Sequence, residues 1–128
     1  MRLLVDTHVM LWWMHGDDRL SERAQSLLRN GDNELLWSLA SSWEIAVKLS
    51  IGKLEFERPL HRFFADLATE QGVAMLPIEH RHCTLLSKLP LHHRDPFDRM
   101  LVVQAQEAGV PLLSADPKLH AYDVDVLW

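Results

Sequence analysis

Four acidic residues, far apart in the sequence, are the side chains best suited to chemistry: Asp6, Glu44, Asp98 and Asp116. Each is predicted to lie where a strand gives way to a helix, or in the first turn of a helix. In a parallel sheet the helices begin at the edge where the strands end, so these residues should gather at that edge. Four carboxylates gathered there repel one another unless a cation lies among them. The pattern therefore predicts a metal site.

A cluster of carboxylates has a defined chemical use. Carboxylate oxygens suit Mg²⁺ or Mn²⁺, which also bind waters and substrate phosphates. Such a metal can orient a water, lower its pKa and stabilise charge on a scissile phosphate. The chain contains no GxxxxGK phosphate loop, no Gly-x-Ser-x-Gly elbow and no GxGxxG fingerprint. We therefore expect metal-assisted phosphodiester hydrolysis, by in-line attack of water that leaves a 5′-phosphate and a 3′-hydroxyl.

Each acid also has an ordinary structural interpretation as a helix cap. Asp6 and Asp116 could each cap the element that follows them. Ser41 and Glu44 match the spacing of a capping box, and Asp95 precedes a proline as an N-cap would. Capping alone, however, gives no reason to bring four like charges to one edge.

The elements that position these residues follow from apolar patterning. Strands are predicted at 2–5, 34–38, 73–78 and 110–114, with 124–128 as a candidate fifth. Helices are predicted at 7–14, 21–30, 41 to about 52, 59–71, 79–89 and from the segment 95–98 to 108. Pro77 places the third strand at an edge or at its own end. Strands that alternate with helices predict an α/β fold: a mostly parallel sheet of four to five strands with helices on both faces.

Size and composition predict one intracellular domain over residues 1–128. The content of 48% hydrophobic and 24% charged residues is that of a soluble globular protein. No apolar stretch approaches the ~20 residues of a membrane helix. The single cysteine, Cys83, excludes an internal disulfide and suits a reducing cytoplasm. We expect a cytoplasmic protein with no membrane association.

The charge balance has two interpretations. With 18 acidic and 13 basic residues the net charge is −5, which by itself argues against nucleic-acid binding. Without the four candidate ligands, 14 acidic residues face 13 basic ones, a net charge of −1. Much of the acidity could therefore belong to the site itself.

Four segments, in this order, carry a resemblance to a known family: LLVDTH at 3–8, SSWEIAVK at 41–48, HRDPFDR at 93–99 and LLSAD at 112–116. Together they resemble a PIN-domain ribonuclease and, more narrowly, the VapC-type toxins of bacterial toxin–antitoxin systems. The resemblance covers essentially the whole chain.

The resemblance implies an endoribonuclease toxin that depends on Mg²⁺ or Mn²⁺, forms a homodimer and is neutralised by a VapB-type antitoxin. By position, Asp6, Glu44, Asp98 and Asp116 match the acidic quartet that holds the metal and carries catalysis. Asp6 and Asp98 match the firmest ligands, with the other two completing the shell directly or through water. Residues beside the quartet are expected to contact the substrate: Thr7, Arg94, Arg99 and Ser114.

Two further features stay open at this point. Asp95 lies three residues before Asp98 and could compete for its role; we prefer Asp98, which leads the apolar helix. Trp12 and Trp13 belong to a helix that is apolar nearly all round, which indicates either burial or a groove that receives a partner segment. The resemblance favours the groove.

Other polar residues are weaker candidates. His92, His93 and Lys48 could contact phosphates, but a solvated loop explains the histidines equally well. His82 and Cys83, with His80, have no second ligand pair at the spacing that a zinc site needs.

Three alternatives to an RNA nuclease remain. The acid cluster does not distinguish RNA from DNA, so a metal-dependent DNA nuclease is one. A phosphoacceptor receiver module has a similar size and an acidic pocket, but normally pairs acids after its first strand, where Asp6 stands alone. An inactive RNA-binding or antitoxin-binding protein is the third.

Overall fold

A five-stranded parallel sheet lies at the centre of the computed structural model, which describes residues 1–128. Its strands are β1 (Arg2–Val5), β2 (Glu34–Ser38), β3 (Ala74–Leu76), β4 (Leu112–Leu113) and β5 (Val126–Leu127). They pair in the order β3-β2-β1-β4-β5, and every neighbouring pair is parallel. The predicted α/β fold with a parallel sheet is therefore confirmed.

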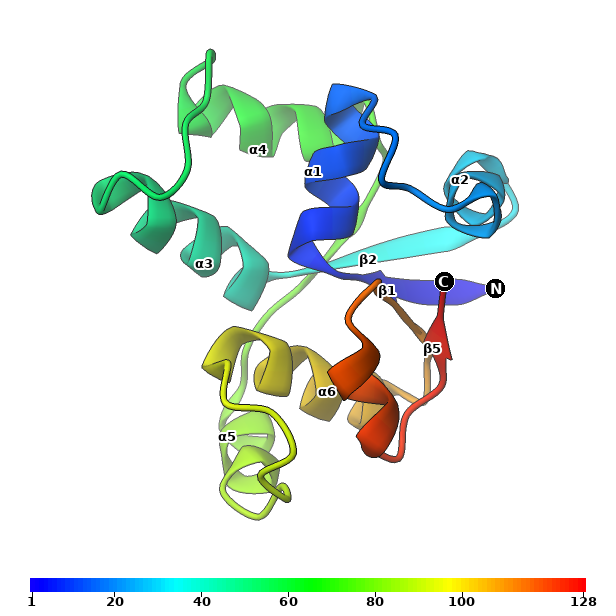
Figure 1. Ribbon diagram of the computed structural model, residues 1–128, viewed down its shortest axis with the longest axis vertical. Helices are drawn as coiled ribbons and strands as arrows, with labels where there is room; N and C mark the ends of the chain where they lie inside the picture. The colour runs from blue at the N-terminus through cyan, green and yellow to red at the C-terminus, as the bar shows by residue number, and fades with distance from the viewer.

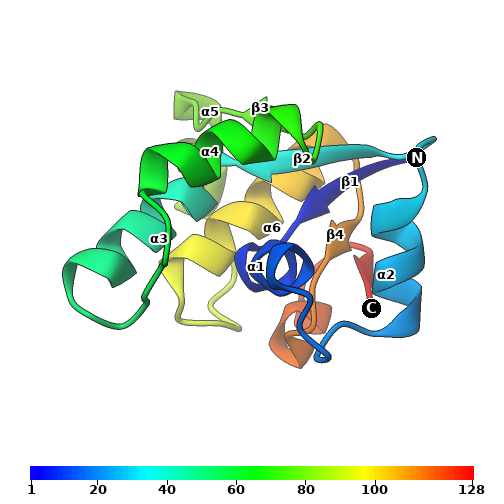
Figure 2. The same ribbon diagram turned by 90° about the horizontal axis from the view of Figure 1, so that it is seen from above.

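Six α-helices and one 3-10 helix cover the sheet. They are α1 (Thr7–His15), α2 (Glu22–Arg29), α3 (Leu39–Ser50), α4 (Leu60–Thr69), α5 (His80–Leu86), α6 (Pro96–Ala108) and η1 (Pro117–Ala121). In Figure 1 the sheet is seen nearly edge-on, with α1, α2 and α4 on one side and α5 and α6 on the other. Figure 2, from above, shows α3 at one end of the sheet, and α3 contacts both α1 and α6.

The strands bury side chains on both faces because helices cover both. In β1, Leu3 and Val5 pack into the core under α1 to α4, whereas Leu4 packs with Leu101 and Val102 of α6. Successive strand residues point to opposite faces, so a strand covered on both sides must be apolar throughout. That is why β1 appears in the sequence as an uninterrupted apolar run.

Several predicted boundaries were too wide. The third strand covers only Ala74–Leu76 of the predicted 73–78, and it lies at the sheet edge, with Pro77 just beyond its end. The fourth and fifth strands are two residues each, because only those residues make ladder pairs with their neighbours. The helices predicted at 59–71 and 79–89 are also shorter, and the element that follows Asp116 is the 3-10 helix η1.

The start of α3 corrects two predictions about Glu44. The helix follows β2 without a loop, because the Ser38 hydroxyl accepts a hydrogen bond from the Ala40 N–H and caps it. Glu44 therefore lies in the second turn rather than the first. The predicted capping box is absent, since the Ser41 hydroxyl bonds to Thr7 and the Glu44 side chain to Lys48.

The strand order also separates this fold from the receiver alternative. Receiver modules have the doubly wound order 2-1-3-4-5, whereas here the order is 3-2-1-4-5. No helix has both the length and the apolar character needed to cross a membrane.

The core predicts a clear difference between two leucine truncations. Leu101 is fully buried between α6 and the sheet, whereas Leu91 is 70% exposed. Leu101→Ala should lower the free energy of unfolding by about 2–5 kcal/mol, because it leaves a cavity. Leu91→Ala should change it by less than about 0.5 kcal/mol. Urea denaturation measures both, and equal losses would contradict the placement of α6.

Candidate metal centre

Three of the acidic residues cap the elements that follow them. Asp6 caps α1, Asp95 caps α6 and Asp116 caps η1. Asp6 and Asp116 each use Oδ1 for this, accepting from the N–H of the residue two positions on. Their Oδ2 atoms contact Ser114 and His93 instead. Capping and clustering therefore coexist, because the two roles use different oxygens of one carboxylate.

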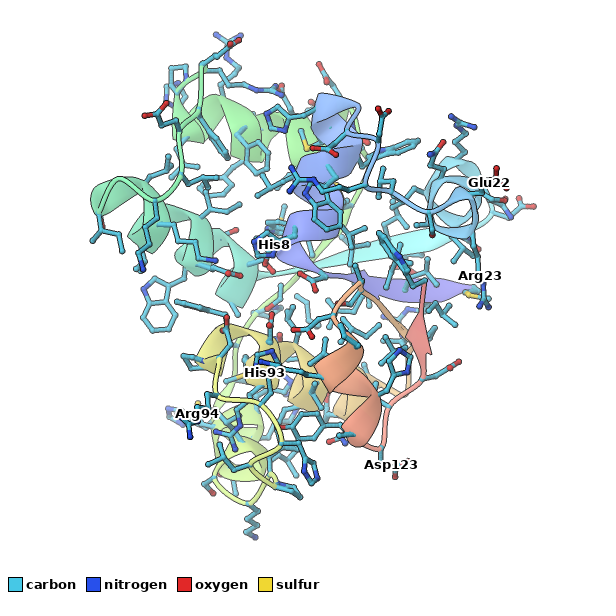
Figure 3. The ribbon with its side chains drawn as sticks, in the orientation of Figure 1. His8, Glu22, Arg23, His93, Arg94 and Asp123 are labelled. Atoms are coloured by element: carbon cyan, nitrogen blue, oxygen red, sulfur yellow. The ribbon has the colours of Figure 1, made fainter.

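These residues share a pocket at the carboxyl edge of the sheet. The pocket has a volume of about 430 Å³, and its lining is Asp6, His8, Val9, Trp12, His93, Asp95, Asp98, Ala115, Asp116 and Pro117. It lies beyond the ends of β1 and β4, where the strand order changes direction, which is where open α/β sheets bind ligands. In Figure 3, His8 from the α1 side and His93 from the α6 side mark this edge.

His93 contacts the side chains of both Asp98 and Asp116. Its Nε2 lies 2.7 Å from Asp116 Oδ2 and 3.1 Å from Asp98 Oδ2. Nitrogen and oxygen atoms of His93, Asp98 and Asp116 that could bind a metal ion lie within 4.8 Å of one another. Asp98 comes from the first turn of α6 and Asp116 from the segment after β4, so the fold brings together residues 18 positions apart in the sequence.

Glu44 adds a buried carboxylate with an unused acceptor. Its side chain is 1% exposed, and Lys48 Nζ lies 2.5 Å from Oε2. Its other oxygen, Oε1, is buried without a hydrogen-bond partner. An unpaired buried carboxylate oxygen costs free energy unless a ligand satisfies it.

Two hydroxyls fix the inner part of the site. Ser114 Oγ donates to Asp6 Oδ2 at 2.5 Å and accepts from the Asp116 N–H at 3.2 Å, so it links the first and last acids. Thr7 Oγ1 donates to Ser41 Oγ at 2.7 Å and ties α1 to α3. Both hydroxyls are buried.

The pKa of each carboxyl group reflects this crowding. Burial raises the pKa of Asp98 to about 8, and the negative charges of Asp6, Asp95, Glu44 and Asp116 add to the shift. Burial also raises the pKa of Asp6, although the Ser114 hydroxyl favours its ionised form. Without a cation the site therefore disfavours full ionisation.

The pKa shifts of Asp116 and Lys48, which are more exposed, have other causes. Burial acts to raise the pKa of Asp116, but the Lys118 N–H and the His93 imidazole outweigh it and hold the pKa below its ordinary value. Partial burial works against the charge of Lys48, yet its hydrogen bond to Glu44 raises its pKa, assisted by the charges of Asp95 and Asp98.

The donor set fits a hard divalent cation. Its carboxylate oxygens are the ligands that Mg²⁺ and Mn²⁺ prefer. A divalent charge would also offset the repulsion that raises the pKa of Asp98, and it would give Glu44 Oε1 a partner. Asp98 and Asp116 offer oxygens within 4.8 Å of each other. That Asp6 and Glu44 join them around one ion stays a prediction.

Asp95 lies close to this set, and one of its carboxylate oxygens caps α6. Its Oδ1 accepts from the N–H groups of Phe97, at 2.8 Å, and Asp98, at 3.2 Å, and its side chain lines the pocket. The preference for Asp98 as the ligand stays a prediction.

The two arginines expected to bind substrate lie outside the pocket lining. Arg99 donates to the Leu89 carbonyl at 2.9 Å, and its Nε is buried without a partner. Arg94 is exposed and extends outward from the loop (Figure 3). A role for either in binding RNA stays a prediction.

The sequence did not predict that His93 and Lys48 contact the acidic residues. The spacing of Glu44 and Lys48, four residues apart on a helix, is the pattern of an ion pair and could have predicted this contact. No sequence signal links His93 to Asp116, 23 residues away.

Comparisons with known proteins identify the family of the chain. The model of the PIN domain matches residues 3–125. The chain is 28% identical over 122 residues to Ribonuclease VapC22 of Mycobacterium tuberculosis, an alignment that covers 94% of this chain and 91% of the relative.

Solved structures resemble the fold along almost the whole chain. VapBC2 from Rickettsia felis, bound to a DNA fragment from its promoter, matches with a TM-score of 0.70 and 9% identity, covering 99% of this chain and 98% of that one. VapBC-5 from Mycobacterium tuberculosis, a member of the VapBC family of toxin-antitoxin systems, matches with a TM-score of 0.61 and 15% identity, covering 98% and 97%. These likenesses concern the fold.

The raised pKa of Asp98 predicts how stability depends on pH. Between its ordinary value of 3.8 and about 8, the folded protein holds a proton that the unfolded chain has lost. The stability of the metal-free protein should therefore fall as the pH rises through this window, by at least about 1 kcal/mol. The lowered pKa of Asp116 acts only at more acidic pH.

Asp98→Asn provides the matched comparison, since asparagine cannot ionise. Thermal melting from pH 5 to pH 8 without metal should show a shallower loss of stability in this variant than in the wild type. Equal pH dependence in the two proteins would contradict the assignment of the shift to Asp98.

Proposed function

The chain belongs to the PIN-domain family, and on that premise we propose that it is a divalent-metal-dependent endoribonuclease toxin. The observation that carries the proposal is the gathering of Asp6, Glu44, Asp98 and Asp116 at one edge of the sheet, with Asp98 raised in pKa and Glu44 Oε1 unpaired. Stability alone does not account for this arrangement, because the buried charges oppose folding.

When bound, the cation would lower the pKa of an attacking water and offset the charge that develops on the scissile phosphate. The chain's own residues hold the acids in place for this role. Ser114 holds Asp6 by its Oδ2, His93 holds Asp98 and Asp116, and Lys48 neutralises one oxygen of Glu44. Glu44 Oε1 remains available to hold the metal or a water beside it.

RNA is favoured as the substrate over DNA by the similarity to a ribonuclease. Parallel assays with RNA and DNA of the same sequence separate the two. Cleavage of DNA alone would favour the alternative of a DNA nuclease.

A groove beside the site supports an antitoxin as the partner. It has a volume of about 280 Å³, and its lining is His8, Leu11, Trp12, His15, Asp17, Arg19, Leu54, Glu55 and Phe56. His8 and Trp12 also line the pocket that contains the acids, so the groove adjoins that pocket. The solved VapBC-5 structure belongs to a toxin-antitoxin family, which supports the same partner class here.

The homodimer implied by the resemblance stays a prediction, to be measured by light scattering.

Asp6→Asn and Asp98→Asn should each abolish RNA cleavage and leave the fold intact. Each removes a charge that binds the cation. The expected loss in kcat is at least about 10²–10³-fold, the loss typical of removing one group that stabilises charge in the transition state. Asp123→Asn is the matched control, since Asp123 is exposed and lies away from the site (Figure 3). Cleavage is measured on single-stranded RNA with Mg²⁺ or Mn²⁺, and circular dichroism checks the fold. Wild-type cleavage that continues unchanged in excess EDTA would contradict the proposal.

A further inference from the structure

His93 contacts three acidic residues of the site through its two ring nitrogens. Nε2 lies 2.7 Å from Asp116 Oδ2 and 3.1 Å from Asp98 Oδ2. On the other side of the ring, Nδ1 lies 3.2 Å from the backbone nitrogen of Asp95. The side chain is only 10% exposed, so these contacts are shielded from water.

The contact with Asp95 decides which nitrogen carries the proton. A backbone N–H can only donate, so Nδ1 must accept and cannot hold a hydrogen. The ring hydrogen therefore lies on Nε2, which donates to both carboxylates. A metal ligand needs a lone pair at the coordinating nitrogen, so His93 in this position is a hydrogen-bond donor to the acids and not itself a ligand.

The segment that carries Asp116 also fixes the His93 ring. The backbone N–H groups of His92 and His93 donate to the Tyr122 hydroxyl at 3.1 and 3.0 Å. Tyr122 is buried and directly follows η1, the helix that Asp116 caps. One end of η1 thus anchors the histidine, and the histidine in turn contacts the acid at the other end.

Asp116 has few other contacts that hold it in place. It follows a strand of only two residues, and its side chain is 28% exposed. Only the Lys118 N–H and His93 bond to its carboxylate. Each carboxylate oxygen has two lone pairs, so an oxygen that accepts from His93 can still face a cation.

We propose that His93 is a positioning residue for the divalent cation: its Nε2–H holds Asp98 and Asp116, from two separate elements, in the arrangement that binds the metal. The inference rests on the proposed function, since it assumes that these acids bind a divalent ion. A neutral donor shared by two carboxyl groups holds them together without adding a positive charge that would repel the cation. Loss of such outer contacts typically lowers metal affinity about 10–100-fold.

Two substitutions of His93 separate this role from simple support of the loop. In His93→Asn the shorter amide can still accept from the Asp95 N–H, but it cannot reach the two carboxylates. In His93→Gln the longer side chain can place an amide N–H near the position of Nε2. His61→Gln is the control, because His61 is exposed and lies on α4, away from the acids.

The measurement is calorimetric titration of Mn²⁺ into each purified protein without RNA, with thermal melting to check the fold. His93→Asn should bind Mn²⁺ about 10–100-fold more weakly than the wild type. His93→Gln should retain most of the affinity, and His61→Gln all of it.

Two results would overturn the inference alone. One is wild-type affinity in His93→Asn; the other is equal loss in His93→Asn and His93→Gln, which would mean that the donor to the acids is not what matters. If the wild-type protein itself bound no Mn²⁺, the proposed metal-dependent function would fail, and the inference with it.

Discussion

The repulsion among carboxylates at one edge of the sheet is the constraint on which the rest of the site depends. Asp98 shows it most directly, since burial and four neighbouring negative charges raise its pKa to about 8. The fold tolerates this because donors surround the acids: backbone N–H groups at the starts of α1 and η1, the Ser114 hydroxyl and the His93 imidazole. These donors reduce the repulsion but leave a net negative pocket, which is what a divalent cation requires.

The helix starts serve stability and chemistry together. A carboxylate at an N-cap satisfies an otherwise unpaired N–H and interacts favourably with the helix dipole. In Asp6 and Asp116 that role uses Oδ1 alone, and Oδ2 remains for the site. The interpretation of each acid as a cap and its interpretation as a ligand are therefore compatible. A parallel sheet makes the combination general, because it places all such helix starts at one edge.

The sequence predicted the fold well because its strongest signals are local. Apolar runs such as 2–5 mark strands buried on both faces, and strands that alternate with helices require parallel pairing. Strand lengths were less predictable, since the two residues of β4 are defined by their partners in β1 and β5. Two features of the site could not be predicted from the sequence. His93 meets Asp116 across 23 residues, and Glu44 lies a turn later in α3 than its capping-box spacing indicated, because Ser38 begins the helix at the strand end.

Proton release on metal binding tests the central claim most directly. At pH 7 the Asp98 carboxyl group is mostly protonated, so a cation that binds there must displace its proton. Titration of Mn²⁺ into the RNA-free protein, in two buffers of different ionisation enthalpy, measures the number of protons released. The account predicts binding with release of about one proton in the wild type, and much less in Asp98→Asn. Mn²⁺ binding without proton release, or no binding, would contradict it.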